Sequence, residues 1–184
     1  MADEKHSVCP VQLAGSLDNR FRRIFQNPLK ILGPYIKEGM SVLDIGCGPG
    51  FFSIDMAQMA GKSGNVIAAD LQTGMLKKLE KKIRGTELEG RIRLHQCKKD
   101  GIDLGEKVDF ALAFYMVHEI EDKMAFFREV SALLNPKGRF LIVEPPFHVS
   151  KREFERTINT ACEAGLKLLM RPDIFLNKSA LLGI

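Results

Sequence analysis

The sequence predicts an α/β domain built on a doubly wound, seven-stranded sheet that is mostly parallel and has an antiparallel last strand. Three observations support this fold class. Apolar runs typical of buried parallel strands alternate with amphipathic helical segments. A glycine-rich loop follows the first apolar run. The last two strands follow one another without a helix, and a short loop can join only antiparallel neighbours.

The first part of the core is predicted to form a strand, a glycine loop, a helix and a strand. Residues 41–46 (SVLDIG) and 65–70 (NVIAAD) are the two strands, and residues 51–61 between them have helical spacing. Gly61 can end this helix, because glycine adopts the left-handed conformation of a C-terminal cap at little steric cost. We therefore expect a βαβ unit with parallel strands.

The alternation of helices and strands continues to residue 182. The expected elements, in order, are a helix over 73–84, strands over 91–96 and 108–114, a helix over 122–134, a strand over 139–143, a helix over 150–164, and strands over 166–170 and 178–182. Ahead of the first strand, residues 18–37 are predicted to be largely helical around Pro28. The 184 residues are the length of one domain, so we expect a single unit, with a helical arm over 1–38 and the core over 41–184.

Composition excludes several classes of protein. The hydrophobic fraction of 45% and charged fraction of 27% are ordinary for a globular domain. No apolar run approaches the roughly 20 residues that span a bilayer, and the first nine residues are polar, so we expect a cytoplasmic protein with no membrane partner. The formal charge of +4 is a weak indication of a nucleic-acid partner. The cysteines lack metal-ligand spacing, so we expect free thiols and no metal; they are Cys9, Cys47, Cys97 and Cys162.

Glycines crowd the loop after the first strand, where they allow a tight turn and close approach of a ligand to the main chain. Gly46, Gly48 and Gly50 are in place, but Phe51 stands where a dinucleotide-binding GxGxxG pattern requires its last glycine. VLDIGCGPG instead resembles the first motif of class I S-adenosylmethionine-dependent methyltransferases, which have a Rossmann-like fold. The resemblance implies that S-adenosyl-L-methionine is the cofactor.

Two further segments carry the same resemblance. VDFALAFYMVHEIED is similar to the fourth strand and following loop of the small-molecule branch of the family, and LLNPKGRFLIVEP is similar to its fifth-strand segment. Together the matches cover about 42–144. The resemblance implies methyl transfer to a small-molecule acceptor, which the sequence leaves unidentified.

The resemblance also implies roles for individual residues in cofactor binding. Asp70, at the end of the second strand, would accept the ribose hydroxyls, although it can also cap the helix that begins near residue 73. Leu71 and Gln72 would flank the adenine. Asp44 would order the loop near the methionine end, or serve the structure alone. The full set of candidate cofactor-binding residues is Asp44, Gly46, Cys47, Gly48, Gly50, Asp70, Leu71, Gln72, Cys97, Lys98 and Phe114.

One departure from the family pattern follows the third strand. The family usually has an acid there that meets the adenine amino group, whereas this chain has Lys98 at that position and Asp100 two residues later. The adenine contact is therefore expected from the backbone of Cys97 and Lys98, or from Asp100. Cys47 is expected to be a small residue fitted to a crowded loop rather than a redox thiol.

The candidate catalytic residues lie on the loops after the fourth and fifth strands. In-line methyl transfer depends mainly on alignment and needs a general base only when the acceptor holds its proton tightly. His118 is the first candidate, because imidazole titrates near pH ~6.5, and Tyr115 is the second. His118 could equally cap or order its loop. Glu119, Glu144 and His148 are weaker candidates.

Other functions remain open at this point. They are an RNA-modifying methyltransferase, a nicotinamide-dependent oxidoreductase, and a non-catalytic module that binds S-adenosylmethionine. The sequence shows no inserted cap domain that would cover the acceptor. We therefore expect the helical arm, or a second subunit in a homodimer, to close the site.

Overall fold

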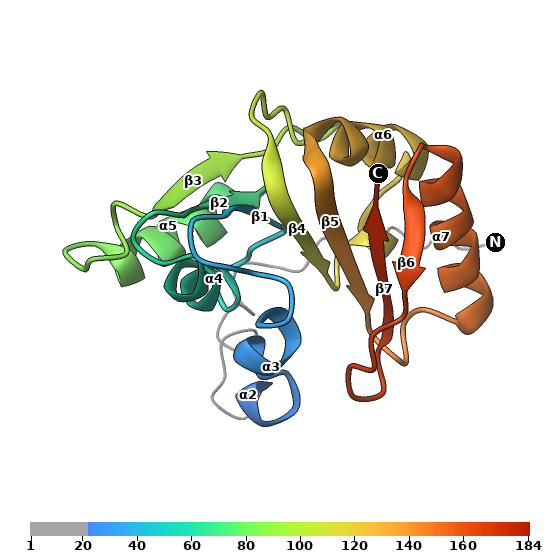
Figure 1. Ribbon diagram of the computed structural model, residues 1–184, viewed down its shortest axis with the longest axis horizontal. Coiled ribbons are helices and arrows are strands. Elements are labelled where there is room, and N and C mark those ends of the chain that lie inside the picture. Colours follow the sequence, from blue (N-terminus) through green and yellow to red (C-terminus); the bar gives the residue numbers. More distant parts are fainter. Residues whose placement is uncertain (1–21) are drawn as a thin grey trace.

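A computed structural model of the protein describes residues 22–184 and contains the predicted sheet (Figure 1). The strands are β1 (Ser41–Ile45), β2 (Asn65–Asp70), β3 (Ile92–Gln96), β4 (Val108–Phe114), β5 (Leu134–Glu144), β6 (Lys167–Met170) and β7 (Lys178–Gly183). They lie in the order β3-β2-β1-β4-β5-β7-β6. Neighbours from β3 to β5 are parallel, whereas β7 is antiparallel to both β5 and β6. The predicted antiparallel last strand is confirmed.

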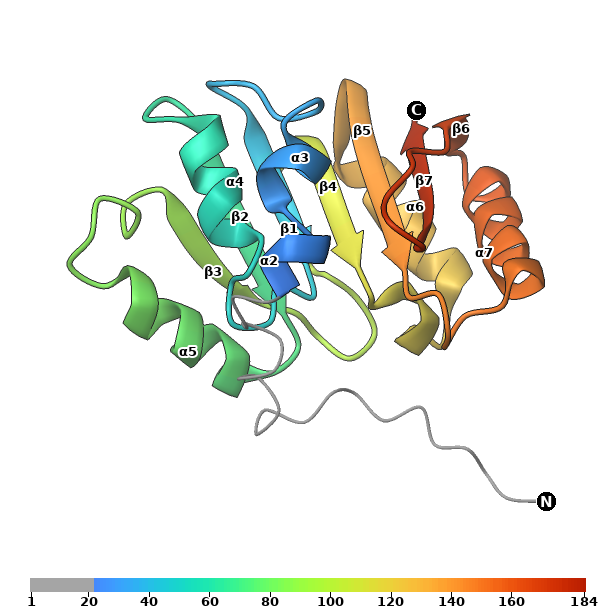
Figure 2. The same ribbon diagram turned by 90° about the horizontal axis from the view of Figure 1, so that it is seen from below.

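Helices cover both faces of the sheet (Figure 2). They are α2 (Arg22–Phe25), α3 (Pro28–Leu32), α4 (Ser53–Ala60), α5 (Thr73–Ile83), the 3-10 helix η2 (Val117–Glu119), α6 (Lys123–Leu133) and α7 (Lys151–Glu163). Figure 2 shows α2, α3 and α4 in front of the sheet and α6 behind it. The arrangement is the doubly wound layering expected of parallel strands joined by helices.

Strand side chains alternate between two apolar cores, because successive residues of a strand point to opposite faces. Val42 and Leu112 face one core, which also contains buried side chains of α3, α4 and α5. Leu43 and Ala111 face the other core, together with buried side chains of α6 and α7. Both faces of the central strands are therefore buried, as their continuous apolar runs indicate.

Several predicted element ends are confirmed. Helix α4 ends at Ala60, and Gly61 follows it with a φ of 69°. Helix α7 begins after Ser150, whose hydroxyl oxygen accepts a hydrogen bond from the backbone N–H of Glu153 at 3.1 Å. A side-chain acceptor at this position satisfies one of the backbone N–H groups that a helix start leaves without a partner.

Two element boundaries and the form of the arm differ from the predictions. The predicted helix over 122–134 ends at Leu133, and Leu134 already belongs to β5, where it pairs with Val108 before an irregularity in the register. The arm forms two short helices, because Pro28 begins α3 under a cap from Asn27. Residues 1–21 of the predicted arm, including Cys9, lie outside the described residues.

The connection from β3 to β4 over residues 97–107 contains no helix, in line with the predicted order of elements. The α6 residue Glu129 holds this loop, since its carboxylate accepts backbone N–H bonds from Ile102 at 2.8 Å and Asp103 at 2.6 Å. The Ile102 side chain is buried in the core beside α6. The buried Ile102 side chain and the hydrogen bonds to Glu129 hold this helix-free crossover against α6.

Candidate active site

A cavity of about 930 Å³ opens at the carboxyl ends of β1, β2 and β4. Ligands of open parallel sheets bind at this edge, because the loops that leave neighbouring strands diverge there. The residues that line the cavity are Arg22, 44–49, Phe51, Phe52, 70–72, Met75, 97–102, 114–116, 119–122, Ala125 and Phe126. The described lining comes from the loops after β1, β2, β3 and β4, from α5 and α6, and from the arm.

The glycine loop takes a backbone path that only glycine adopts easily. Gly46, Gly48 and Gly50 have φ values of 71°, 54° and 85°. A Cβ at Gly50 would lie 2.3 Å from a methyl carbon of Leu79, whereas a Cβ at Gly48 would meet nothing within 4 Å. Gly50 therefore permits close packing against α5, and Gly48 leaves open space on the cavity side. Gly50 itself does not line the cavity.

Asp70 is held in place by the loops on either side of it. Its carboxylate accepts hydrogen bonds from the backbone N–H of Gly48 at 2.9 Å and from that of Gln72 at 2.8 Å. Burial raises the pKa of Asp70, and these two hydrogen bonds act in the opposite direction. A carboxylate oxygen has two lone pairs, so each can accept a further hydroxyl.

Asp44 lies deeper, at the end of β1, and is 2% exposed. The Ser53 hydroxyl, at the start of α4, donates a hydrogen bond to it at 2.6 Å. Burial raises the pKa of Asp44 to about 6, an effect that the Ser53 bond partly offsets. The bond ties the strand to the helix across the glycine loop.

In the loop after β3, the backbone N–H groups of the two residues expected to meet adenine form hydrogen bonds within the protein. Cys97 donates its N–H to the Asp70 carbonyl, and Lys98 donates its own to the Gly101 carbonyl, both at 3.0 Å. The Lys98 side chain pairs with Asp103 at 2.6 Å. Asp100 lines the cavity together with Cys97 and Lys98, so both predicted sources of the adenine contact, this backbone and the Asp100 carboxylate, lie at the cavity.

The two cavity cysteines are poor nucleophiles. Burial raises the pKa of Cys47 well above its usual value and that of Cys97 to about 12. A thiol reacts as its thiolate, and these environments disfavour the thiolate. The small-residue interpretation of Cys47 is consistent with this environment.

Tyr115 joins two distant segments at the wall of the cavity. Its hydroxyl accepts a hydrogen bond from Gln26, in the arm, at 2.6 Å and donates one to Asn177, before β7, at 2.5 Å. Its φ of 62° is unusual for a residue with a side chain. Burial raises the pKa of Tyr115.

His118 binds a carboxylate from the neighbouring strand end. Its Nδ1 lies 2.6 Å from Oε2 of Glu144, and its backbone N–H donates to Oε1 at 2.9 Å. Glu144 is 1% exposed at the end of β5, and its hydrogen bond raises the pKa of His118. His118 does not line the cavity, and the pair fastens η2 to β5.

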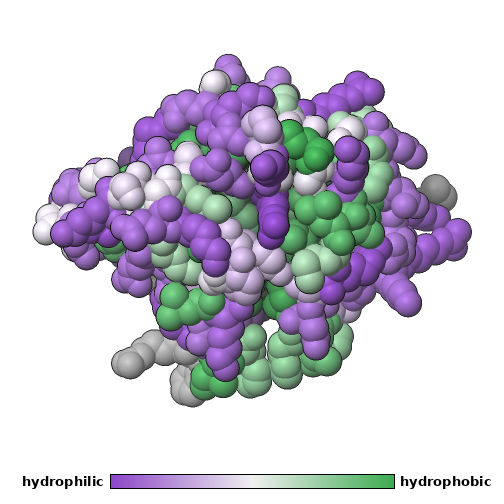
Figure 3. Space-filling model, viewed as in Figure 1, coloured by the Kyte–Doolittle hydropathy of each residue, from purple (hydrophilic) through white to green (hydrophobic). Residues whose placement is uncertain are grey.

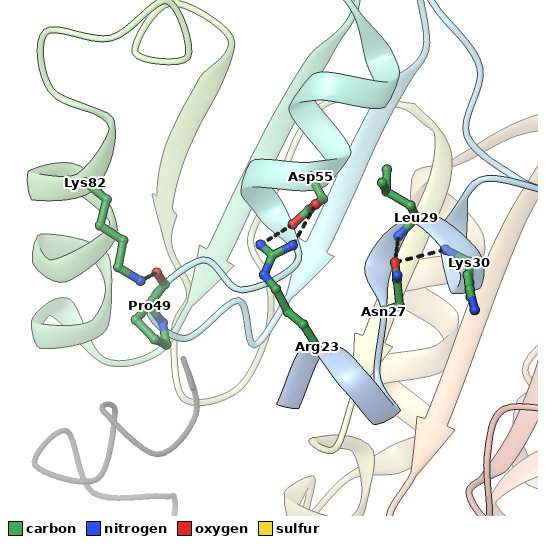
Figure 4. Close-up of polar contacts among 7 residues, drawn as sticks. All are labelled: Arg23, Asn27, Leu29, Lys30, Pro49, Asp55 and Lys82. Atoms are coloured by element: carbon green, nitrogen blue, oxygen red, sulfur yellow. Dashed lines mark hydrogen bonds and ion pairs between the residues drawn. The ribbon is translucent and has the colours of Figure 1, made fainter. Parts of the chain in front are cut away.

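The arm is held beside the cavity by an ion pair, which Figure 4 shows, and by a cation–π contact. Arg23 donates two hydrogen bonds to the Asp55 carboxylate of α4, at 2.8 and 3.1 Å. The guanidinium of Arg22 lies 4.3 Å from the centroid of the Phe51 ring. On the other side of the loop, Lys82 of α5 donates to the Pro49 carbonyl at 2.6 Å. Both neighbouring elements thus support the glycine loop.

The structure brings most of the predicted site residues to one cavity. The predicted residues in its lining are Asp44, Gly46, Cys47, Gly48, Asp70, Leu71, Gln72, Cys97, Lys98, Phe114 and Tyr115. Gly50 and His118 are outside it. Sequence reasoning missed Arg22, Phe52 and Met116, because no local pattern shows which side chains of the arm, the glycine loop and the loop after β4 face this cavity.

The face of the molecule seen in Figure 3 is mainly hydrophilic, with smaller apolar areas between the polar side chains. Residues 22–184 contain no helix long and apolar enough to cross a membrane. Over the same range, no three His, Cys, Asp or Glu side chains are grouped so that they could hold a metal ion.

A family model described as a methyltransferase domain matches residues 36–173. Among curated proteins, the chain is 33% identical over 129 residues to a demethylmenaquinone methyltransferase of Lactobacillus johnsonii, a match covering 68% of this chain and 50% of that protein. It is 28% identical over 130 residues to the ubiquinone/menaquinone biosynthesis C-methyltransferase UbiE of Cronobacter sakazakii, a match covering 70% and 50% of the two chains. The chain thus spans about half the length of the curated relatives it matches.

The fold also matches solved structures. A S-adenosylmethionine-dependent methyltransferase from Aquifex aeolicus superposes with a TM-score of 0.82 at 23% identity, covering 95% of this chain and 97% of that one. This likeness shows a shared fold along almost the whole length of both chains.

Proposed function

The chain belongs to the methyltransferase domain family, and from that membership we propose that it transfers the methyl group of S-adenosylmethionine to a small organic acceptor in the cavity at the carboxyl edge of the sheet. The arrangement of Asp70 is the observation that supports this most directly. Hydrogen bonds from the backbone N–H groups of Gly48 and Gln72 fix the orientation of its carboxylate. Next to it, the space in front of Gly48 is open to a ligand.

The residues present fit an adenosyl sulfonium cofactor. Asp70 would hold the ribose hydroxyls, and Asp100 would meet the adenine amino group. Asp44 and the glycine loop would surround the methionine end, where a carboxylate favours positive charge. The cofactor would supply an activated methyl group on a positively charged sulfur.

The chain's own contribution to catalysis would be alignment and exclusion of water. Phe51, Phe52 and Phe114 are each less than 8% exposed and form an apolar wall beside the glycine loop. Displacement at a sulfonium consumes charge, so an environment with little water favours it. Tyr115 lines the cavity and can orient an acceptor, whereas His118, held by Glu144, would act through the loop that it orders.

Calorimetry with S-adenosylhomocysteine tests the cofactor assignment. We expect the wild-type protein to bind it and Asp70→Asn to bind about tenfold or more weakly, because the amide cannot replace a charged acceptor. The control is Glu106→Gln, which removes the same charge from an exposed side chain paired with Arg93. Absence of binding by the folded wild type would exclude the proposed function, and tighter competition by NAD would favour an oxidoreductase.

A quinol ring is the first acceptor to test, since the names of both curated relatives refer to quinone methylation. Mass spectrometry should detect a methylated product when a reduced naphthoquinone is incubated with the protein and S-adenosylmethionine. Binding of the cofactor with no transfer to any component of a metabolite extract would favour a non-catalytic module. A steep salt dependence of binding to RNA would instead favour an RNA acceptor. A cytoplasmic location and a homodimer stay predictions.

A further inference from the structure

A second, smaller pocket lies at the opposite edge of the sheet from the cavity described above. It has a volume of about 320 Å³ and opens near the starts of β1, β4 and β5. In Figure 2 this is the edge from which the arrows of β4 and β5 start. Its described lining shares no residue with the cavity and consists of Pro34, Tyr35, Lys37, Met40, Asp109, Lys137 and Arg139. A ligand bound here would therefore be separate from the proposed cofactor.

The charge of this pocket is mainly positive. Three exposed cations line it, Lys37 ahead of β1 and both Lys137 and Arg139 near the start of β5. In the part of the chain that the structure describes, none of these three side chains forms a hydrogen bond or an ion pair. Like charges around one pocket repel one another, and an anion placed between them relieves that repulsion.

The carboxylate in the described lining is already used by the fold. One oxygen of Asp109, in β4, accepts a hydrogen bond from the backbone N–H of Ser41 at 2.9 Å. Its other oxygen accepts one from the side-chain amide of Asn135 at 2.8 Å. Asp109 thereby ties β4 to the starts of β1 and β5. Three positive charges thus face one negative charge, which is bound to other groups.

Tyr35 adds a neutral hydrogen-bond donor to the pocket. Its ring stacks on Phe110 of β4, with the centroids 5.9 Å apart and an angle of 6° between the planes. Burial raises the pKa of its hydroxyl, although the charge of Arg139 acts in the opposite direction, so the hydroxyl keeps its proton at neutral pH. This hydroxyl has no hydrogen-bond partner among the described residues and can donate to a ligand oxygen.

The backbone on both sides of the pocket is fixed. Met40 donates its N–H to the Lys37 carbonyl at 3.3 Å, which closes the turn ahead of β1. On the other side, a Cβ at Gly138 would lie only 2.7 Å from the Asn135 carbonyl oxygen, so the two cations of β5 flank a tight turn. A preorganised site loses less conformational entropy when a ligand binds than a mobile one does.

We propose that this pocket binds the phosphate end of a small phosphorylated molecule. Tyr35 and Arg139 would donate hydrogen bonds to the phosphate oxygens, and the two lysines would balance the charge. A planar guanidinium matches the geometry of a phosphate, whereas an ammonium group supplies charge with donors that can rotate.

The charge and the size of the pocket favour a diphosphate group over a single phosphate. A phosphate monoester carries about two negative charges at neutral pH, and a diphosphate carries more. The pocket has about ten times the roughly 30 Å³ that one water molecule occupies in the liquid. Space therefore remains beside one bound phosphate for a second.

Calorimetry of the full chain with inorganic pyrophosphate and with inorganic phosphate tests this proposal. The salt concentration is kept at about 0.15 M, where charges further apart than about 8 Å are largely screened. We expect pyrophosphate to bind about tenfold or more tightly than phosphate, because its second phosphate reaches further donors. Absence of pyrophosphate binding at millimolar concentration would overturn the proposal. Tighter binding of a single-stranded RNA under the same conditions would replace the small molecule by a nucleic acid.

Two-dimensional NMR of the isotope-labelled chain locates the bound pyrophosphate. The amide signals of Tyr35, Lys37 and residues 137–139 should shift during the titration. Shifts confined to residues 46–50 and 97–101 would place the anion in the cavity at the other edge of the sheet and would also overturn the proposal.

Substitutions then test the individual donors. Arg139→Met and Lys137→Met should each weaken pyrophosphate binding about fivefold or more, and Arg139→Lys should keep part of the affinity. Tyr35→Phe keeps the stacked ring but removes the hydroxyl, and it should weaken binding about threefold. The controls are Arg152→Met on α7 and Lys77→Met on α5, which remove exposed charges outside the pocket and should bind as the wild type does.

The controls separate a specific site from general attraction of an anion to a basic protein. Equal weakening in the controls and in the pocket variants would show general attraction, and unchanged binding in both Arg139→Met and Lys137→Met would show that the pocket is not used. Thermal melts check that each variant is folded, since replacing an exposed side chain costs little stability. Arg139→Met should bind S-adenosylhomocysteine within about twofold of the wild type, because the two sites lie at opposite edges of the sheet.

Discussion

At the scale of single residues, the pair of His118 and Glu144 ties the loop after β4 to the end of β5. The carboxylate raises the pKa of the imidazole above 6.5 in the folded protein. A raised pKa means that the folded state binds the proton more tightly than the unfolded chain does. The pair therefore stabilises the fold fully below about pH 6.5, and this stabilisation is lost as the pH rises through the raised folded-state pKa.

We predict that the unfolding free energy of the wild type falls across this pH window and that His118→Gln removes that part of the pH dependence. Urea titrations at a series of pH values measure it. Glu144→Gln should have the same effect, because it removes the hydrogen-bond partner that raises the pKa. An unchanged pH dependence in both variants would mean that the pair contributes nothing to the linkage.

The same pair shows what the sequence can predict about a residue. His118 was predicted as a candidate base from its type and its place after a strand. The structure binds it to a carboxylate 26 positions away, because the ends of β4 and β5 are adjacent in the sheet. Asp70 was easier to interpret, since one of its contacts comes from the glycine motif and the other from a residue two positions further along the chain. Arg22 carried no local signal, because its partners are rings brought together only by folding.

At the scale of elements, different glycines of the glycine loop serve packing and ligand access. Gly50 packs against Leu79 of α5, and Gly48 borders open space. We predict that Gly50→Ala lowers the unfolding free energy by about 3 kcal/mol, because the new methyl group collides with a packed side chain and the φ is positive. Gly48→Ala should cost only about 1 kcal/mol, since strain alone opposes it.

Thermal melts of the two variants measure the difference in their stability. Calorimetry with S-adenosylhomocysteine measures how strongly each variant still binds the ligand. Gly48→Ala should weaken binding more than its small loss of stability suggests, because its methyl group enters the cavity. Equal loss of stability in both variants would contradict the packing role of Gly50.

The sequence predicted these elements well where a local signal exists. Glycines and caps mark the ends of α4, α5 and α7. The start of β5 at Leu134 was missed, because Leu134 continues the apolar spacing of α6 and only its pairing with Val108 assigns it to the sheet. The unusual crossover at 97–107 depends on Glu129, a residue on a helix that follows β4.

At the scale of the whole molecule, the arm closes one side of the cavity and is held mainly by three contacts. They are the Arg23–Asp55 ion pair, the Gln26–Tyr115 hydrogen bond and the buried side chains of α3. We predict that Arg23→Met loosens α2 without unfolding the sheet, because the Asp55 side chain is 5% exposed and would lose a bidentate partner. Amide hydrogen exchange should accelerate in residues 22–27 and stay unchanged in β1 and β4.

Arg93→Met is the matched control for this experiment, since its ion pair with Glu106 is exposed and distant from the arm. Unchanged exchange in α2 of the Arg23 variant would show that the remaining contacts suffice to hold the arm.

The strand order has a consequence for how the protein is made. All the lining residues described for the cavity lie within 22–126, whereas β6 has no neighbour in the sheet until β7 forms between it and β5. During synthesis on the ribosome, β1 to β5 can pair in turn. The backbone groups of β6 stay unpaired until β7 has been made. Unpaired strand edges promote aggregation, so the pairing of β7 covers the exposed edges of β5 and β6 in one step.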